Sequence, residues 1–178
     1  MNEGIITARY SKALYQLGEE EDKIEKLKHD INIILTTIED SPDFKKFISS
    51  PIIKEKIKIK VLEEIFSGHL EPITVNFLKL LTTNKRENLL PYICLYFIRY
   101  YKEKKGIKEA ILTTATPLDK EYLKLINKII KKKLNINIDL KERLDTSIVG
   151  GFKLRIEDNQ IDASISTKLQ KLKSDLIN

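Results

Sequence analysis

The sequence is poor in the residues that most enzymes use for chemistry. Its 178 residues include one cysteine and two histidines. Cys94 alone excludes a disulfide framework and a cluster of thiolate metal ligands. His29 and His69 stand far apart in the chain and lack the HxxxH spacing of a helical zinc site. These shortages argue against most classes of enzyme, and we expect no catalytic residue, no metal and no cofactor.

Long apolar runs are also missing. The densest one, residues 89–98, is interrupted by Pro91 and followed by Arg99, whereas a helix that crosses a bilayer needs about 20 apolar residues. Residues 1–4 show no basic n-region and begin no apolar stretch of signal-peptide length. We therefore expect a soluble protein without direct membrane insertion, from a bacterial cytoplasm or an organelle-encoded gene.

Positive charge is in moderate excess. The chain has 32 basic and 26 acidic residues, which gives a net charge of +6. Such an excess permits nucleic acid, an anionic membrane surface or an acidic partner, and requires none of them. A basic RNA-associated binding module therefore stays an alternative hypothesis for function. Stacking on bases would need exposed aromatic side chains, but several tyrosines cluster in one apolar segment, which favours packing: Tyr92, Tyr96, Tyr100 and Tyr101.

Apolar residues at helical spacing predict six helices in the first hundred residues. Ser41-Pro42 and Ser50-Pro51 match an N-cap followed by proline at the first helical position, and Glu71-Pro72 opens a helix as well. Cys94 lies in the most apolar helix, where it fits best as a small core residue. The helix opened by Pro51 carries the stripe Ile53, Ile57, Val61 and Ile65. The expected helices cover residues 6–18, 24–38, 42–48, 51–68, 72–84 and 89–106.

The pattern changes after Gly106. Short β-branched or alternating segments predict strands over residues 110–115, 136–140, 152–156 and 160–162, the last two joined by a tight turn at Asp158-Asn159. A helix is predicted over residues 118–134, with its inward face at Leu118, Tyr122, Leu125, Ile126 and Ile129. A last helix follows the stripe Ile165, Leu169, Leu172 and Leu176.

The predicted fold is therefore α+β and mainly α. An N-terminal six-helix bundle over residues 1–105 precedes a small α/β C-terminal domain over residues 106–178. The glycine pair Gly150-Gly151 leads into a strand, whereas a phosphate-binding loop leads into a helix. We expect a turn or bulge at positive φ there instead. The acidic run at residues 19–22 precedes a helix, where negative charge is favoured.

Residues 148–165, IVGGFKLRIEDNQIDASI, carry the most specific signal in the chain. They closely resemble the C-terminal signature of the delta subunit of F-type ATP synthases, a family that includes the mitochondrial oligomycin-sensitivity-conferring protein. Residues 8–14 (ARYSKAL) resemble the first helix of that family, and residues 76–81 (NFLKLL) resemble its fifth helix. The resemblance covers essentially the whole chain. Its signature positions are Gly150, Gly151, Phe152, Ile156, Ile161, Asp162 and Ser164.

The resemblance implies a non-catalytic subunit of the peripheral stalk, which links the catalytic head to the membrane sector and supports rotary, proton-coupled ATP synthesis. It implies that a groove between the first and fifth helices binds the N-terminal helix of an alpha subunit. The matching positions are Tyr10, Ala13, Asn76 and Leu80, with core packing as the alternative role of Leu80 and, in part, of Tyr10.

The same resemblance implies that the C-terminal domain meets the C-terminal ends of the b subunits. Asp162 and Ser164 are interpreted as caps of the last helix, not as contacts to a partner. The implied location is the cytoplasmic face of the bacterial inner membrane, where the chain is peripheral and held through its partners, and no nucleic acid is expected.

Overall fold

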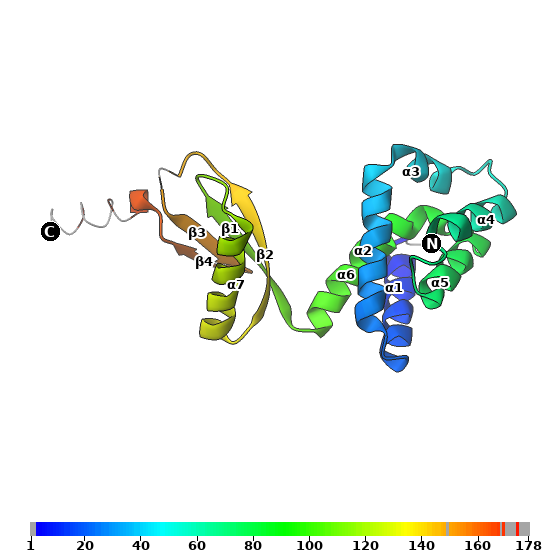
Figure 1. The fold of residues 1–178 in the computed structure, drawn as a ribbon, viewed down its shortest axis with the longest axis horizontal. Coiled ribbons are helices and arrows are strands. Elements are labelled where there is room, and N and C mark those ends of the chain that lie inside the picture. Colours follow the sequence, from blue (N-terminus) through cyan, green and yellow to red (C-terminus); the bar gives the residue numbers. More distant parts are fainter. Residues whose placement is uncertain (1–2, 149, 168, 170–173, 175–178) are drawn as a thin grey trace. The chain divides into compact units, whose positions relative to one another are not determined.

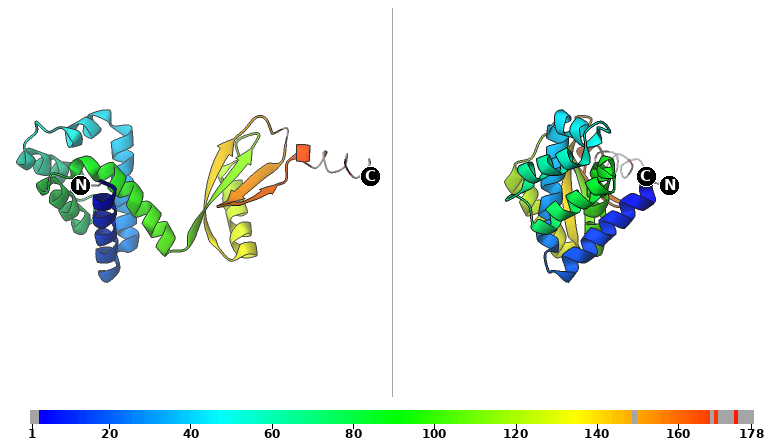
Figure 2. Two further views of the ribbon diagram at one scale, coloured as in Figure 1. Left: turned by 180° about the vertical axis from the view of Figure 1, so that it is seen from behind. Right: turned by 90° about the vertical axis from the view of Figure 1, so that its right-hand side faces the viewer.

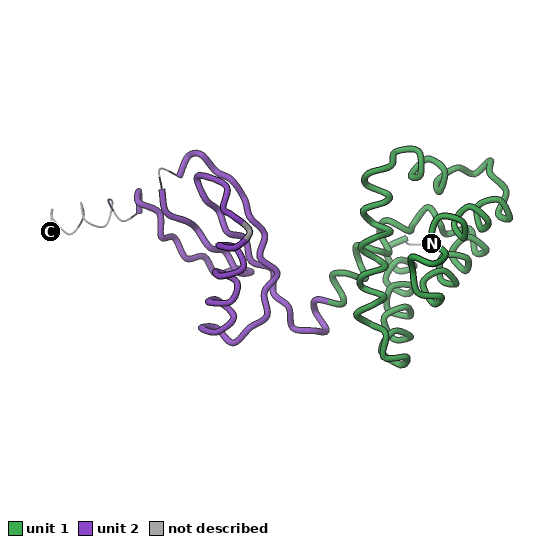
Figure 3. Tube along the Cα trace, viewed as in Figure 1, with its two compact units in different colours: residues 1–101 green, residues 102–178 purple. Residues whose placement is uncertain are grey.

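The protein has two compact units of different architecture. The structure, a computed structural model, describes residues 3–148, 150–167, 169 and 174. The first unit extends to Tyr101 and the second begins at Lys102 (Figure 3). This division lies slightly before the domain boundary after residue 105 that the sequence indicates. The described chain is mainly helical with one small sheet, an α+β fold.

Helices occur at all six predicted positions of the first hundred residues, and a short 3-10 helix precedes the sixth (Figure 1). Their bounds are α1 (Glu3–Glu20), α2 (Ile24–Asp40), α3 (Pro42–Ser49), α4 (Glu55–Phe66), α5 (Pro72–Thr83), η1 (Glu87–Leu89) and α6 (Leu90–Lys104).

The helices α3 and α5 begin at prolines, as the sequence predicts. At α3 the side chain of Ser41 accepts a hydrogen bond from the Phe44 N–H. At α5 the cap comes from another helix, because the buried carboxylate of Asp30 accepts bonds from the Glu71 N–H (2.9 Å) and the Thr74 hydroxyl (2.6 Å). One carboxylate thus satisfies the start of α5 and fixes it to α2.

The prediction that Pro51 opens the fourth helix is wrong. Residues 51–53 form a bend, Ile52 is 90% exposed, and α4 begins only at Glu55. The inward face of α4 is also displaced by one residue from the expected stripe, since Ile57 is half exposed whereas Lys58 is buried. The Lys58 ammonium donates to the Ile48 carbonyl (2.9 Å) and pairs with Glu87 (2.5 Å), which lets a charged residue occupy this face.

Gly18 does not end the first helix, because α1 continues to Glu20. A Cβ at this position would lie 2.6 Å from Cδ1 of Leu27 and 3.1 Å from Cδ1 of Ile24. The glycine therefore allows α1 and α2 to approach closely, which is a packing role and not a helix stop.

All six helices of the first unit contribute buried apolar residues to its core, and α2 and α6 carry several of the most deeply buried ones. Leu27, Ile31 and Ile34 of α2 and Ile93, Cys94 and Phe97 of α6 have no exposed surface. The sequence interpretation of Cys94 as a core residue is confirmed, and burial raises the pKa of its thiol to about 12.

The second unit is a four-stranded sheet with one described helix against it (Figures 1 and 2). Its elements are β1 (Ile107–Thr114), α7 (Lys120–Leu134), β2 (Asn137–Leu144), β3 (Phe152–Ile156) and β4 (Asn159–Asp162). The order is β2-β1-β3-β4, with β1 parallel to β2 and the other pairs antiparallel. The hairpin turn lies at residues 157–158, one position before the predicted turn, and Glu157 takes a positive φ of 51°.

The core of the second unit lies between the sheet and α7. Its buried residues are Ala110, Leu112, Ile130, Ile138, Leu154 and Ile156. The predicted inward face of α7 is partly wrong. Leu118 and Ile126 do pack against this core, but Tyr122, Leu125 and Ile129 are 61%, 52% and 46% exposed, and Leu123 packs inward instead. Leu172 and Leu176 of the predicted last helix lie outside the described residues.

Candidate partner-binding surfaces

The first and fifth helices meet through aromatic rings. Tyr10 of α1 packs edge-on against Phe77 of α5, with ring centroids 6.2 Å apart and an interplanar angle of 69°. Phe77 is buried and Tyr10 is half-buried. This contact joins α1, which also carries Ala13, to α5, which also carries Asn76 and Leu80.

The name α1–α5 surface is used here for the exposed or half-buried positions on these two helices that the resemblance marks, together with Leu17 of α1: Tyr10, Ala13, Leu17, Asn76 and Leu80. Ala13 and Asn76 are exposed, Leu17 is 40% exposed and Leu80 is 50% exposed. Core packing, the alternative role of Leu80, is therefore excluded for this conformation. Tyr10 has one side against Phe77 and the other accessible, so it contributes to both core and surface.

Neighbouring helices hold α1 and α5 in place. The hydroxyl of Ser11, which is fully buried, lies 2.9 Å from the Thr7 carbonyl and 2.9 Å from the Ile93 carbonyl, and the second of these joins α1 to α6. Lys79 of α5 pairs with Glu63 of α4 at 2.5 Å. The α1–α5 surface is thus carried by two helices that are anchored on their other sides.

A hollow of about 540 Å³ lies between the start of α1 and α6, and the sequence did not predict it. Thr7, Tyr92, Leu95 and Tyr96 line it, and the guanidinium of Arg99 lies 4.7 Å from the ring centre of Tyr96. Tyr92 is 62% exposed, so it is not among the tyrosines of this helix that pack into the core, whereas Tyr101 is buried.

The glycine pair in the second unit is required by its surroundings. Gly151 has φ of +83°, and a Cβ there would lie 2.4 Å from the Ala163 carbonyl oxygen and 3.0 Å from Cα of Ser164. A Cβ at Gly150 would lie 2.6 Å from Cδ1 of Ile165. The predicted positive φ is confirmed for Gly151, and both glycines allow the chain after β4 to pass closely over the start of β3.

Asp162 and Ser164 act in the turn that starts the last helix, as the sequence interpretation holds. The Asp162 carboxylate accepts the Ser164 N–H at 2.9 Å, and the Ser164 hydroxyl accepts the Thr167 N–H at 3.4 Å. Ser164 is completely buried. The hydrogen bonds from Ser164 lower the pKa of Asp162 to about 2, because they stabilise the ionised carboxylate. Of the other signature residues, Ile156 is buried, whereas Phe152 and Ile161 are 41% and 55% exposed.

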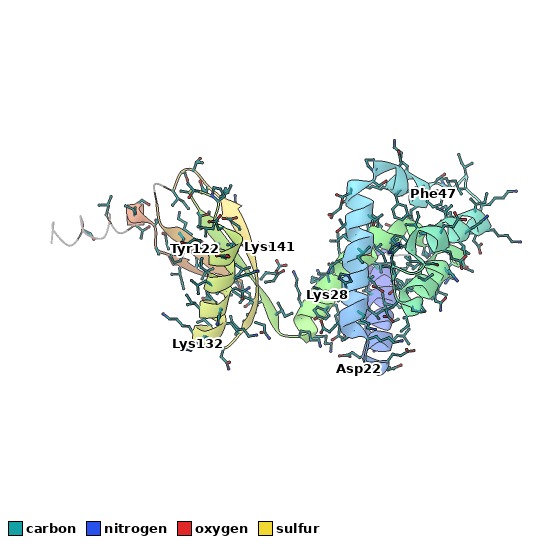
Figure 4. The ribbon with its side chains drawn as sticks, in the orientation of Figure 1. Asp22, Lys28, Phe47, Tyr122, Lys132 and Lys141 are labelled. Carbon is teal, nitrogen blue, oxygen red and sulfur yellow. The ribbon has the colours of Figure 1, made fainter. Side chains whose placement is uncertain are left out.

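A second hollow, here called the α7–sheet pocket, was also missed by the sequence interpretation. It has a volume of about 450 Å³ and lies between α7 and the sheet. Nearly all of its lining is apolar: Leu112, Thr114, Leu118, Ile126, Ile129, Ile130, Gly151, Phe152 and Leu154. The sequence feature that could have indicated this pocket is the number of apolar residues on α7, which is larger than one buried helix face needs. Tyr122 is one of those that project from the helix (Figure 4).

The histidines are closer in the fold than their sequence separation indicates. His29 and His69 line one shallow hollow together with Asp30 and Glu71. Even so, no group of three or more histidine, cysteine, aspartate or glutamate side chains is arranged to hold a metal ion within the described part of the chain. Among the same residues, no helix has the length and apolar character needed to cross a membrane.

The sequence of the chain matches a known protein family over nearly its whole length. A model of the ATP synthase delta (OSCP) subunit matches residues 6–176. The chain is 34% identical over 168 residues to ATP synthase subunit delta of Christiangramia forsetii, covering 94% of this chain and 91% of that protein. It is 35% identical over 173 residues to ATP synthase subunit delta of Lactobacillus gasseri, covering 97% and 94% respectively.

Solved structures give a consistent comparison. A chain in the cryo-EM structure of the Toxoplasma gondii mitochondrial ATP synthase hexamer aligns over 97% of both chains, with a TM-score of 0.67 and 26% identity. A chain in a cryo-EM structure of the Polytomella F-ATP synthase, refined on the F1 head and rotor, aligns over 56% of this chain and 89% of that chain. Its TM-score of 0.51 at 13% identity shows a shared fold.

Proposed function

The chain belongs to the ATP synthase delta (OSCP) subunit family, and from this membership we propose how its two units take part in the complex. It is a non-catalytic subunit of the peripheral stalk of an F-type ATP synthase, a membrane-associated complex. We infer that the first unit, acting as a six-helix bundle over residues 1–105, binds the N-terminal helix of an alpha subunit. The C-terminal domain, residues 106–178, binds the b subunits.

The α1–α5 surface is the observation that carries the alpha-subunit proposal. Ala13 is a small exposed residue on α1, and Leu80 is a large exposed apolar residue on α5. An amphipathic helix that binds a protein surface places apolar side chains at i, i+3, i+4 and i+7 against such positions. Ala13 leaves space for the incoming backbone, Leu80 supplies apolar contact, and Asn76 supplies a polar group at the edge.

Rigidity also supports a role in the stalk. A stator has to resist torque, so its binding surface should not deform when load is applied. The buried bond from Ser11 to Ile93 and the Asp30 cap of α5 hold both helices of the α1–α5 surface against the rest of the first unit. Such buried polar contacts favour one arrangement of the helices, because breaking them leaves polar groups without partners.

The location follows from the same proposal. The chain is peripheral, at the cytoplasmic face of a bacterial inner membrane, and is held there by alpha and b subunits and not by insertion of its own helices. The family membership gives no support to the alternative hypothesis of an RNA-associated module, and the net charge of +6 is then a lightly basic surface for protein partners.

A titration with the alpha-subunit helix tests the proposal. The full chain is titrated by calorimetry with a peptide of the alpha-subunit N-terminal helix from the same source. Ala13→Asp should weaken binding at least about tenfold, about 1.4 kcal/mol, because it places a charge against an apolar partner face. Thr36→Asp is the matched control, since Thr36 is also exposed on a helix but lies on α2, outside the surface. Equal affinities of the two variants would contradict the assignment.

A further inference from the structure

The first unit has a polar pocket that is separate from the α1–α5 surface. Its volume is about 600 Å³, within the range of about 300–1,000 Å³ that is typical of ligand-binding pockets. Residues 48–55, which run from the end of α3 to the start of α4 (Figure 1), line it together with Lys58 of α4. Thr82 of α5 and residues 85–88, which follow that helix, complete the lining. This hollow is here called the α4–α5 pocket.

A carboxylate of this pocket has an oxygen atom without a hydrogen-bond donor. Glu87 pairs with the Lys58 ammonium through Oε1, whereas its Oε2 atom is buried and accepts no hydrogen bond. No other buried side-chain nitrogen or oxygen atom lacks a partner among the residues that the structure describes. Such an atom costs free energy, because it has lost water and gained no donor in exchange. A group that enters the pocket with a hydrogen-bond donor can remove this cost after a small rotation of the carboxylate.

Three cations of the lining have no acidic partner. Lys54, Lys85 and Arg86 form no ion pair within the described part of the chain. The lining has two carboxylates, and Glu87 is already paired with Lys58, so Glu55 is the one that remains to oppose these three cations. The start of α4 adds positive potential, because Lys54 provides no side-chain cap for its first N–H groups. The α4–α5 pocket therefore favours a negatively charged occupant.

The same lining favours a protein segment over a small anion or a nucleic acid. Ile52 belongs to it and is 90% exposed, on a bend where its N–H donates to the Ser50 hydroxyl at 3.4 Å. A small anion would neutralise the cations and leave Ile52 in water, whereas a segment with an apolar side chain would cover it, which is favourable. The lining includes no aromatic residue on which a base could stack.

We propose that the α4–α5 pocket binds an acidic segment of a partner protein. A carboxylate of the segment pairs with Lys85 and Arg86, a hydroxyl or backbone N–H donates to Oε2 of Glu87, and an apolar side chain covers Ile52. Charge complementarity of this kind selects acidic partners against basic ones. The first unit thus has a second binding surface, and neither its chemistry nor its test depends on the alpha-subunit proposal.

A peptide titration of the full chain tests the proposal. The probe is the hexapeptide Asp-Glu-Ser-Leu-Asp-Glu with blocked ends, and binding is followed through the NMR shifts of the backbone amides of Ile52 and Arg86. Lys85→Glu with Arg86→Glu should weaken binding at least about tenfold, because two attractive charges become repulsive. Lys45→Glu with Lys46→Glu is the matched control, since both lysines are exposed on α3 and outside the lining. No binding to the unchanged chain, or equal affinities of the two variants, would overturn the proposal.

Further arms of the titration identify the occupant. Ile52→Ser should weaken peptide binding about threefold or more and leave the fold intact, because this side chain lies almost wholly in water. Serine→alanine in the peptide should weaken binding by a similar factor, because Glu87 loses its donor. Sulfate that binds as tightly as the peptide would show a small-anion site instead, and a single-stranded RNA that binds more tightly would show a nucleic-acid site; either result would overturn the proposal.

The outcome is separate from that of the alpha-subunit titration. All arms use the full chain without other subunits, and the alpha-subunit peptide should bind the Lys85→Glu, Arg86→Glu variant as it binds the unchanged chain. None of the five residues of the α1–α5 surface belongs to the lining of the α4–α5 pocket. A failure at one surface therefore leaves the proposal for the other in place.

Discussion

The substitution Gly151→Ala should destabilise the second unit through two separate effects. At φ of +83° an L-residue costs about 1–2 kcal/mol relative to glycine. The added Cβ would also lie 2.4 Å from the Ala163 carbonyl oxygen and 3.0 Å from Cα of Ser164. Both neighbours are backbone atoms, so the strand and the turn have to shift, at a further cost of about 1–3 kcal/mol. The expected loss is about 2–5 kcal/mol in total.

Gly106→Ala is the matched control in the same unit. Gly106 also has a positive φ, +62°, but among the described residues no atom beyond its chain neighbours lies within 4 Å of the position that the added methyl group would take. The control should therefore lose only the conformational part, about 1–2 kcal/mol, and the gain from restricting the unfolded chain is common to both variants. The difference between the two variants isolates the contact with residues 163 and 164.

Native-state hydrogen exchange is the suitable assay, because it reports the opening free energy of β1 and β3 separately from the first unit. Calorimetry should show the same order, with a melting temperature about 4–8 °C lower per kcal/mol for a unit of this size. Equal losses for Gly151→Ala and Gly106→Ala would refute the reasoning, since the close approach of residues 163 and 164 would then have no energetic consequence.

Three further substitutions test other polar contacts. Asp30→Ala should cost about 1–2 kcal/mol and increase exchange at the start of α5, measured by hydrogen exchange, because the cap is lost; unchanged protection there would refute it. Lys58→Met should cost about 2 kcal/mol in urea unfolding, since Glu87 loses its partner, and adding Glu87→Gln should restore part of it. The pKa of Asp162 lies at about 2, below its ordinary 3.8, so its ionised form stabilises the folded state at higher pH and this stability is lost as pH falls from about 4 to 2. In Asp162→Asn the melting temperature of the second unit should change less over that range; an unchanged slope would contradict this.

The parts of the fold that depend on local chemistry could be predicted from the sequence. Pro42 and Pro72 fix the starts of α3 and α5, and the apolar setting of Cys94 places it in the core. The glycine pair before β3 was expected at positive φ, and Gly151 has it. In each of these cases the residues that determine the structure are close to one another in the chain, so the local sequence pattern is enough to predict it.

Contacts between distant segments could not be predicted in this way. The cap of α5 comes from Asp30, and Lys58 is buried only because Glu87 and the Ile48 carbonyl lie beside it. In the sequence Gly18 looks like the end of a helix. Its packing role is visible only from the position of Leu27 in the fold. A sequence pattern does not show which segment packs where, so it does not show which polar residue finds a buried partner.

The wrong helix face on α7 has a further explanation. This helix has two adjacent apolar stripes, Leu123–Ile126–Ile130 toward the sheet and Tyr122–Leu125–Ile129 toward the surface. Periodicity does not distinguish a core stripe from a second one that is about 100° away around the helix. A helix that packs on a sheet alone needs one stripe, and the second remains exposed unless another element covers it.

The same excess of apolar surface appears on the first unit. There Leu80 lies beside the buried Leu81 on α5, and Ala13 lies beside the buried Leu14 on α1. Exposed apolar residues of this kind do not stabilise the isolated unit. A protein whose units each needed only their own core would have no use for them. On the first unit their presence is explained if they are covered in use, as we propose, by a helix of the alpha subunit. The exposed apolar residues Ala13 of α1 and Leu80 of α5 are thus the ones through which we expect the first unit to bind that helix.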